Sequence, residues 1–189
     1  SVAQADWQGG AGIEQFNWEE TLQSPPLSPK ESGSRYALHL NWEENGDSGL
    51  LYAYRAKLYN GRVQYDTYTQ LSYIPVSTHT DYNGMTHEGQ LISRRNLGNY
   101  QLDYVGGLGW DSWRRTINMS QIEDFSIWFL RTGISLDQPM QGRGFHGSGG
   151  LKFPLKTSED AHLYSMGYDA NPQLSPGKSP SLYAELAAS

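Results

Sequence analysis

The chain contains no cysteine, which excludes a disulfide framework, a thiolate metal site and a cysteine nucleophile. It also has no apolar run that approaches the ~18 consecutive residues needed by a membrane-spanning helix. Hydrophobic residues make up 37% of the 189 residues, below the ~45–50% of an ordinary soluble protein. The net charge is -6 and no basic stripe is present, so nucleic acid is not an expected partner.

Aromatic residues and glycine are plentiful by contrast: the chain has 13 Tyr, 6 Trp and 21 Gly. Disordered chains are poor in aromatic residues, so a folded chain is expected. Low total hydrophobicity with many aromatic residues is typical of sheets that have one apolar and one polar face.

Alternation of apolar and polar residues with period two is the main signal. It is clearest at 36–43, 50–59, 100–111 and 151–156, and a helix would instead need a period of 3.6. The pattern predicts about eight strands, at 6–20, 34–45, 48–66, 84–96, 99–116, 123–136, 143–168 and 181–188.

Connection lengths alternate along the chain. Tight turns are expected at 44–47, 96–99 and 137–140, and longer polar or Pro-rich connections at 19–34, 67–83, 117–122 and 169–180. This asymmetry is typical of outer-membrane barrels. We therefore expect an all-β, antiparallel up-and-down transmembrane β-barrel. Asn60-Gly61 would fit either a hairpin turn or one long strand with a β-bulge, and we favour the long strand because it keeps the alternation.

The polar face of such a barrel would line its lumen, because burying these groups singly in a dry core costs on the order of 2–7 kcal/mol each. We expect the following residues to form a lumen ion-pair network or to line a narrow pore: His39, Glu43, Arg55, Lys57 and Asp103. Trp and Tyr near strand ends match the aromatic girdles of membrane interfaces.

The stretches 49–59 (GLLYAYRAKLY), 86–90 (THEGQ) and 102–115 (LDYVGGLGWDSWRR) resemble small outer-membrane β-barrel proteins of proteobacteria, many of which have no assigned activity. The resemblance implies a place in the outer membrane of a Gram-negative bacterium and no cofactor. The expected surroundings and partners are then outer-membrane lipids, lipopolysaccharide and the barrel assembly machinery, with the chain as a monomer.

Both ends of the chain carry expectations. Ala3-Gln4-Ala5 has the form of a signal-peptidase site, so residues 1–5 would be the remnant of a signal peptide and 6–189 a single barrel domain. Barrels of this type usually end in a strand that closes with Phe or Trp, whereas this chain ends in YAELAAS. That departure indicates either that one or more C-terminal strands are missing, or that the barrel closes in a different way. We favour truncation, in which case the eight strands would be part of a barrel of about ten.

The pair His146 and Ser148 resembles the His-x-Ser pair of lipid A 3-O-deacylases, with Asp160 or Glu159 as the orienting carboxylate. Other histidines and acids, at 79–81 and 87–88, match no compact zinc pattern, so no metal site is expected. The leading hypothesis is a non-enzymatic barrel with a structural, surface-interaction or narrow-pore role. The alternatives are a lipid A-modifying barrel hydrolase and a soluble lipocalin-like barrel that binds an apolar ligand.

Overall fold

The computed structural model describes residues 5–19, 29–69, 72–117, 121–140, 143–162, 173–174 and 179–188. Within these ranges the regular structure is all strand: β1 (Ala5–Glu19), β2 (Lys30–Glu44), β3 (Gly49–Tyr68), β4 (Pro75–Leu97), β5 (Tyr100–Thr116), β6 (Ile122–Met140), β7 (Arg143–Asp160), the two-residue β8 (Gln173–Leu174) and β9 (Ser181–Ala188). The described part of the chain holds no helix with the length and apolar character needed to cross a membrane.

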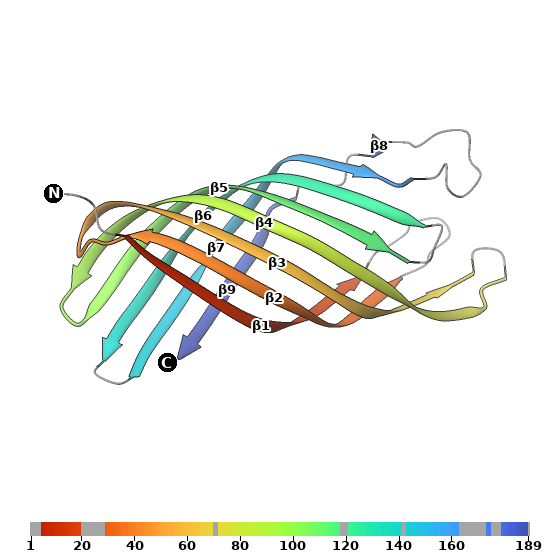
Figure 1. Cartoon of the computed structure of the whole chain (residues 1–189), viewed down its shortest axis with the longest axis horizontal. Coiled ribbons are helices and arrows are strands. Elements are labelled where there is room, and N and C mark those ends of the chain that lie inside the picture. Colours follow the sequence, from red (N-terminus) through yellow and green to blue (C-terminus); the bar gives the residue numbers. More distant parts are fainter. Residues whose placement is uncertain are drawn as a thin grey trace.

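The strands form one antiparallel sheet in which neighbours along the chain are neighbours in space, from β1 to β7. Strand β9 then pairs with β7 along Phe145 to Lys152, and β8 adds only a short pairing at the far end of β7 (Figure 1). Eight antiparallel up-and-down strands are therefore confirmed. The sheet is not closed: among the described residues no pairing joins β1 to β9, which are its two edges.

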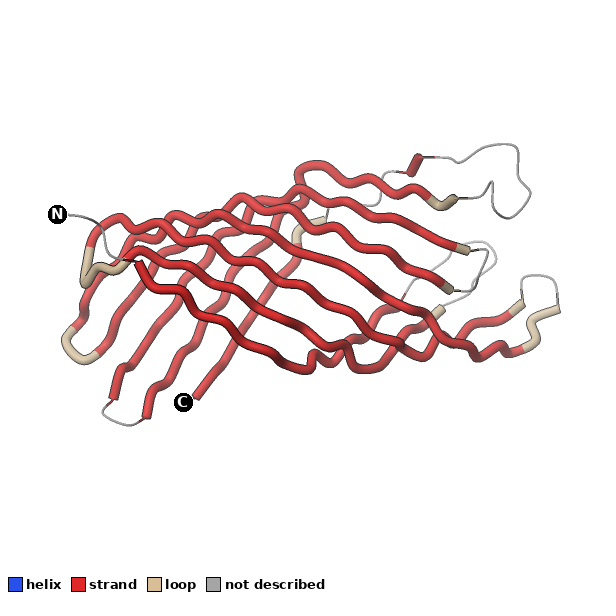
Figure 2. The backbone as a smooth tube through the Cα atoms, in the orientation of Figure 1, coloured by secondary structure: helices blue, strands red, loops and turns tan. Residues whose placement is uncertain are grey.

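The connections fall into two groups at opposite ends of the sheet. The strand ends that are separated by only two to four residues, those of β2–β3, β4–β5 and β6–β7, lie at one end of the sheet, called here the short-turn end. The strand ends separated by longer stretches of chain lie at the other end, called the long-loop end (Figure 2). Gly98 has a φ of +67°, the left-handed conformation that a tight turn demands and that glycine adopts without strain. The predicted alternation of connection lengths is thus present.

The course of strand β3 decides between the two interpretations of Asn60-Gly61, a hairpin turn or one long strand. It runs unbroken from Gly49 to Tyr68, as favoured, and its register with β4 does not shift, so no β-bulge is present there. Val63 is 1% exposed because it lies on the interior face. The register shift occurs instead between β6 and β7, at Trp128 and Phe129.

Strand β4 is longer than the sequence pattern predicted. It begins at Pro75, although 67–83 was expected to be a long connection. Residues 75–83 are mostly polar on both faces, which hides the alternation, but they pair with the second half of β3 from Asn60 to Tyr68. The β3–β4 hairpin is therefore a long ribbon with its connection at 69–74.

Candidate functional site

The polarity of the sheet is inverted relative to an ordinary soluble protein. Its outward positions form an outer apolar band that includes Trp7, Ile13, Tyr36, Leu38, Leu50, Tyr52, Leu58, Tyr104, Leu108, Trp128, Ile134, Leu182 and Leu186, all more than a third exposed. The residues buried on the other face include Glu31, Glu88, Gln90, Asp103, Arg115 and Glu123. Charged residues are rarely buried unless they are paired or functional. Because these charged side chains are almost fully buried beneath an apolar exterior, the interior is the candidate functional site.

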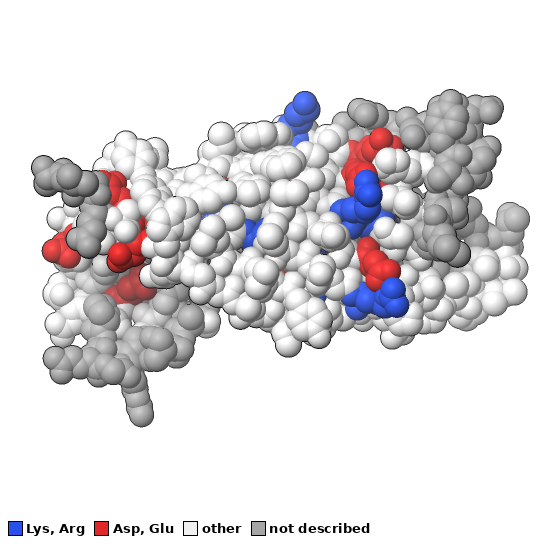
Figure 3. Space-filling view, in the orientation of Figure 1, with Lys and Arg blue, Asp and Glu red and all other residues white. Residues whose placement is uncertain are grey.

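Beyond the outer apolar band, toward the long-loop end, ion pairs join consecutive strands on the outer face (Figure 3). Their members are Lys30–Glu19, Arg62–Asp81 and Arg114–Asp124, defined here as the outer girdle. Hydrogen bonds from Arg62, at 2.7 and 2.9 Å, hold the pKa of Asp81 below its usual value. Those from Arg114 likewise lower the pKa of Asp124. Such exposed pairs add little stability, but they mark where the apolar exterior ends.

The interior at the short-turn end is held by Arg94, which gathers two of the predicted lumen residues. Its guanidinium donates to Asp103 at 2.8 and 3.0 Å and to Glu43 at 2.6 Å. A further hydrogen bond of 3.1 Å reaches the carbonyl oxygen of Gly46 in the turn after β2. The sequence pattern placed Glu43 and Asp103 in one network or pore lining with Arg55 and Lys57. Their observed partner is Arg94, whose role the sequence pattern did not reveal.

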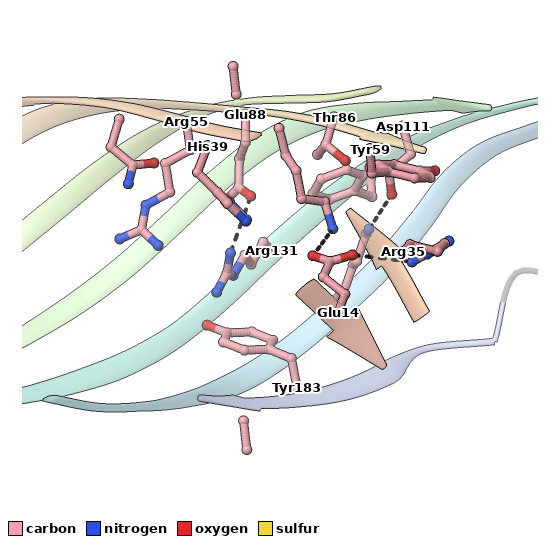
Figure 4. A pocket seen from close by; sticks show the side chains of 16 residues that line it. Glu14, Arg35, His39, Arg55, Tyr59, Thr86, Glu88, Asp111, Arg131 and Tyr183 are labelled. Atoms are coloured by element: carbon pink, nitrogen blue, oxygen red, sulfur yellow. Dashed lines mark hydrogen bonds and ion pairs between the residues drawn. The ribbon is translucent and has the colours of Figure 1, made fainter. Parts of the chain in front are cut away.

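The middle of the interior is a chamber of about 620 Å³ that all eight long strands border (Figure 4). Of the predicted lumen residues, His39, Arg55 and Lys57 line it. Lys57 donates to Glu14 at 2.9 Å, and Glu14 also lies 3.4 Å from Arg35. Since β1 contributes Glu14 and β9 contributes Tyr183 and Ala184, both edges of the sheet border the same chamber.

Further ion pairs in the chamber join strands that are not neighbours. Arg131 on β6 lies 3.3 Å from Glu88 on β4, and Lys152 on β7 donates to Asp111 on β5. Glu88 also accepts from Gln90 at 2.6 Å. These contacts are possible only because the sheet is strongly curved, so that side chains of alternate strands meet inside it.

An aromatic layer separates this chamber from the long-loop end. The guanidinium carbon of Arg35 lies 4.3 and 4.6 Å from the ring centroids of Phe16 and Tyr59, within the range of a cation–π contact. Trp113 and Phe125 stack with centroids 4.8 Å apart. These side chains border a second, smaller cavity of about 240 Å³.

The long-loop end of the interior is occupied by what we call the Glu31 network. Glu31, whose side chain is 0% exposed, accepts from Arg115 at 2.7 and 3.0 Å and from Thr80 at 3.0 Å, and it also accepts from Tyr82. Arg115 in turn donates to Glu123 at 2.7 Å. Because Glu31 is on β2 and Arg115 on β5, this network spans the interior.

Gly109, on the inner face of β5, leaves room for the fully buried Phe129 ring. A Cβ atom there would meet three ring carbons, two of them at 2.7 and 2.8 Å. Gly109→Ala is therefore expected to destabilise the fold by about 1–3 kcal/mol through overpacking. Denaturant unfolding followed by tryptophan fluorescence measures this. Gly106→Ala on the outer face, where a Cβ meets nothing within 4 Å, is the matched control, and equal midpoints for the two variants would contradict the packing argument.

The pair His146 and Ser148 lies near the short-turn end, with its side chains on the inner face. His146 Nδ1 is 2.6 Å from Asp137 Oδ1, so Asp137 is its carboxylate partner. Asp160 lies at the opposite end of β7 and is not brought near the pair. Ser148 faces Ser135 across the β6–β7 ladder and makes no hydrogen bond to His146. The structure therefore supplies a His–Asp pair without a contacting nucleophile.

Of the other histidines considered for metal binding, His79 lies on β4 opposite Gln64 of β3. His87 lies on the outer face, where Tyr54 Oη is 2.5 Å from its Nδ1 and its ring stacks against Trp110. Across the described ranges, no group of three or more His, Asp or Glu side chains is placed to hold a metal ion.

Fold and interior together define a class: an all-β, up-and-down antiparallel sheet curved around an ion-paired interior. Searches against protein-family models, curated proteins and solved structures find no match to this chain.

Proposed function

We propose that the chain is a transmembrane β-barrel of the Gram-negative outer membrane, with a structural, surface-interaction or narrow-pore role. The observation that carries the proposal is the inverted polarity: apolar side chains outside and buried ion pairs inside. In water the outer apolar band would be an exposed patch far larger than monomeric soluble proteins tolerate. In lipid the same band is favourable, and the polar interior is sheltered.

The extent of the band fits a bilayer. On β3 the outward residues from Leu50 to Leu58 are all apolar, whereas Asn60 and Arg62 beyond them are polar. A tilted strand needs about 9–11 residues to cross a membrane. Tryptophans paired across strands lie toward both margins, Trp7 with Trp42 and Trp110 with Trp128, as expected of interfacial aromatic belts.

A place in lipid requires closure, because every backbone polar group must then be satisfied internally. We propose that β1 and β9 pair directly and complete an eight-stranded barrel. Eight-stranded barrels leave an interior that side chains nearly fill. The Glu31 network and the aromatic layer occupy the interior here, which favours a braced barrel over a wide porin.

The competing functions fit the geometry less well. A barrel that binds an apolar ligand would need an apolar cavity, but the chamber is lined by charged groups such as Arg55, Lys57 and Glu88. A lipid A hydrolase would present its nucleophile to lipid, whereas Ser148 is on the inner face near the short-turn end. Under the proposal the barrel assembly machinery and lipopolysaccharide are the natural partners of a monomeric chain.

The direct test is the folding condition. The chain is refolded into detergent micelles and, separately, in plain buffer, and each sample is run unheated and boiled on a denaturing gel. We expect a heat-dependent mobility shift in micelles and aggregation in buffer. A monodisperse protein that folds in buffer alone would overturn the membrane assignment.

A further inference from the structure

The chamber in the middle of the interior carries more positive than negative side chains, although the whole chain has a net charge of -6. Five cations line it: Arg35, Arg55, Lys57, Arg131 and Lys152. Only three carboxylates face them: Glu14, Glu88 and Asp111. A surplus of one sign inside low-dielectric walls attracts ions of the other sign.

Four of the five cations in the chamber take part in ion pairs with described residues, and the guanidinium of Arg55 does not. Glu14 serves both Lys57 and Arg35, while Asp111 binds Lys152. Glu88 forms an ion pair with Arg131 and accepts a hydrogen bond from Gln90. Arg55 points into the chamber (Figure 4), and within the described part of the chain no hydrogen bond or ion pair engages it, although Glu88 is its register partner on β4.

Two further donors in the same chamber lack acceptors. The Nε atoms of Arg35 and Arg131 are buried and have no hydrogen-bond partner among the described residues. Native proteins rarely leave buried donors unsatisfied. Arg35 lies against two aromatic rings, Phe16 and Tyr59, whereas Arg131 lies over one, Tyr183, at 3.9 Å. The side chain of Arg131 is also slightly more exposed, at 18% against 14% for Arg35, so Arg131 is the less enclosed of the two.

We propose that the chamber binds one small free oxyanion, a carboxylate or phosphate, between Arg55 and Arg131. A guanidinium offers a planar fork of donors that matches the two oxygens of such a group. The volume of about 620 Å³ admits a small solute. The ligand is a solute and not a lipid headgroup, because both arginines lie on the inner face, away from the outer apolar band. This inference rests on the proposed function and adds that the interior of the barrel prefers anions.

Titration calorimetry with inorganic phosphate, on protein folded in zwitterionic micelles at low salt, tests the proposal. We expect saturable binding that Arg55→Gln weakens about tenfold or more, the scale of losing a charge-assisted hydrogen bond. Arg55 suits replacement because it holds no other described group in place. Arg55→Lys keeps the charge but not the fork, and should retain only part of the affinity. Chloride, which has no pair of oxygens, should bind more weakly than phosphate.

Arg62→Gln is the matched control, since it removes the same charge from the outer girdle and should leave phosphate binding unchanged. Equal binding by the wild type and Arg55→Gln, or no saturable heat from the folded wild type, would overturn the oxyanion site. The proposed function fails separately: a protein that folds and binds phosphate in plain buffer keeps the site and loses the membrane assignment.

Discussion

Cysteines introduced together as Ile13→Cys and Ala184→Cys are expected to form a disulfide that joins β1 to β9 in the folded protein. These strands carry the two free edges of the sheet. They run in opposite directions, because β1 leads away from the short-turn end and β9 returns toward it. Direct pairing would therefore continue the antiparallel pattern all the way round.

The register of this closure follows from barrel geometry. With eight strands tilted by about 35–45°, spaced about 4.8 Å and rising about 3.3 Å per residue, one circuit shifts the register by roughly 8 to 12 residues. The shift must be even, since an odd one would turn the apolar face of one strand inward.

The observed pairings then locate the partner of Ala184. Starting from Ala184, the successive register partners on neighbouring strands are Gly149, Ile134, Tyr104, Ser93 and Leu50. When the registers of β3 with β2 and of β2 with β1 are extended in the same way, this row of partners reaches β1 two positions before Ala5. A shift of about ten residues from there gives Ile13. The same register places Glu14 opposite Tyr183. This agrees with the structure, in which both residues line the chamber.

The natural absence of cysteine makes this test clean, because every bridge is an engineered one. Non-reducing gels would compare Ala184→Cys paired with cysteine at Ala11, Ile13 or Gln15, which correspond to shifts of about 8, 10 and 12 residues. Gly12→Cys points to the other face and serves as the negative control. If the folded protein forms only bridges between two copies, or none at any position, direct closure is wrong.

Removing Glu31 is expected to be the most damaging single truncation of the interior. Glu31→Ala takes the acceptor from Arg115, Thr80 and Tyr82 at once. Breaking a buried ion pair by removing one partner typically costs about 3–5 kcal/mol. Because Glu123 still pairs with Arg115, we expect a loss near the lower end of that range, measured by denaturant unfolding of the refolded protein.

Glu19→Ala provides the comparison. Glu19 pairs with Lys30 at 3.4 Å on the outer girdle, and their side chains are 53% and 61% exposed. An exposed pair of this kind is worth about 0–1 kcal/mol, so this variant should unfold close to the wild type. Equal losses for Glu19→Ala and Glu31→Ala would show that the network spanning the interior does not brace the fold.

Much of the sheet could be predicted from the sequence because its signal is local. Alternation at 36–43, 50–59 and 100–111 assigned the two faces correctly, and it placed His39, Arg55 and Lys57 inside. Period two is a property of each strand alone, so it needs no knowledge of neighbours. The first part of β4 was missed for the same reason: residues 75–83 are mostly polar on both faces, and only their pairing with β3 reveals a strand.

The partners of the interior charges could not be predicted. Glu31, Arg94 and Arg115 carry much of the interior network, yet in the sequence they are unremarkable charges, and Arg94-Arg95 and Arg114-Arg115 look like basic surface spots. Arg94 reaches Glu43 on β2, and Arg115 reaches Glu31 on the same strand. These contacts join strands that are not adjacent, which depends on the curvature of the sheet. Curvature leaves no periodic trace in one strand, so a charge network across the interior is visible only in three dimensions.

The order of the strands also bears on how the protein folds. Each pairing from β1 to β7 joins segments that follow one another along the chain, so each hairpin forms by closing a short loop at low entropic cost. A seam between β1 and β9 would instead join segments near opposite ends of the chain. Contacts of that separation form slowly, so the seam should be the last step of folding. Until then the exposed strand edges offer sites for pairing with another chain.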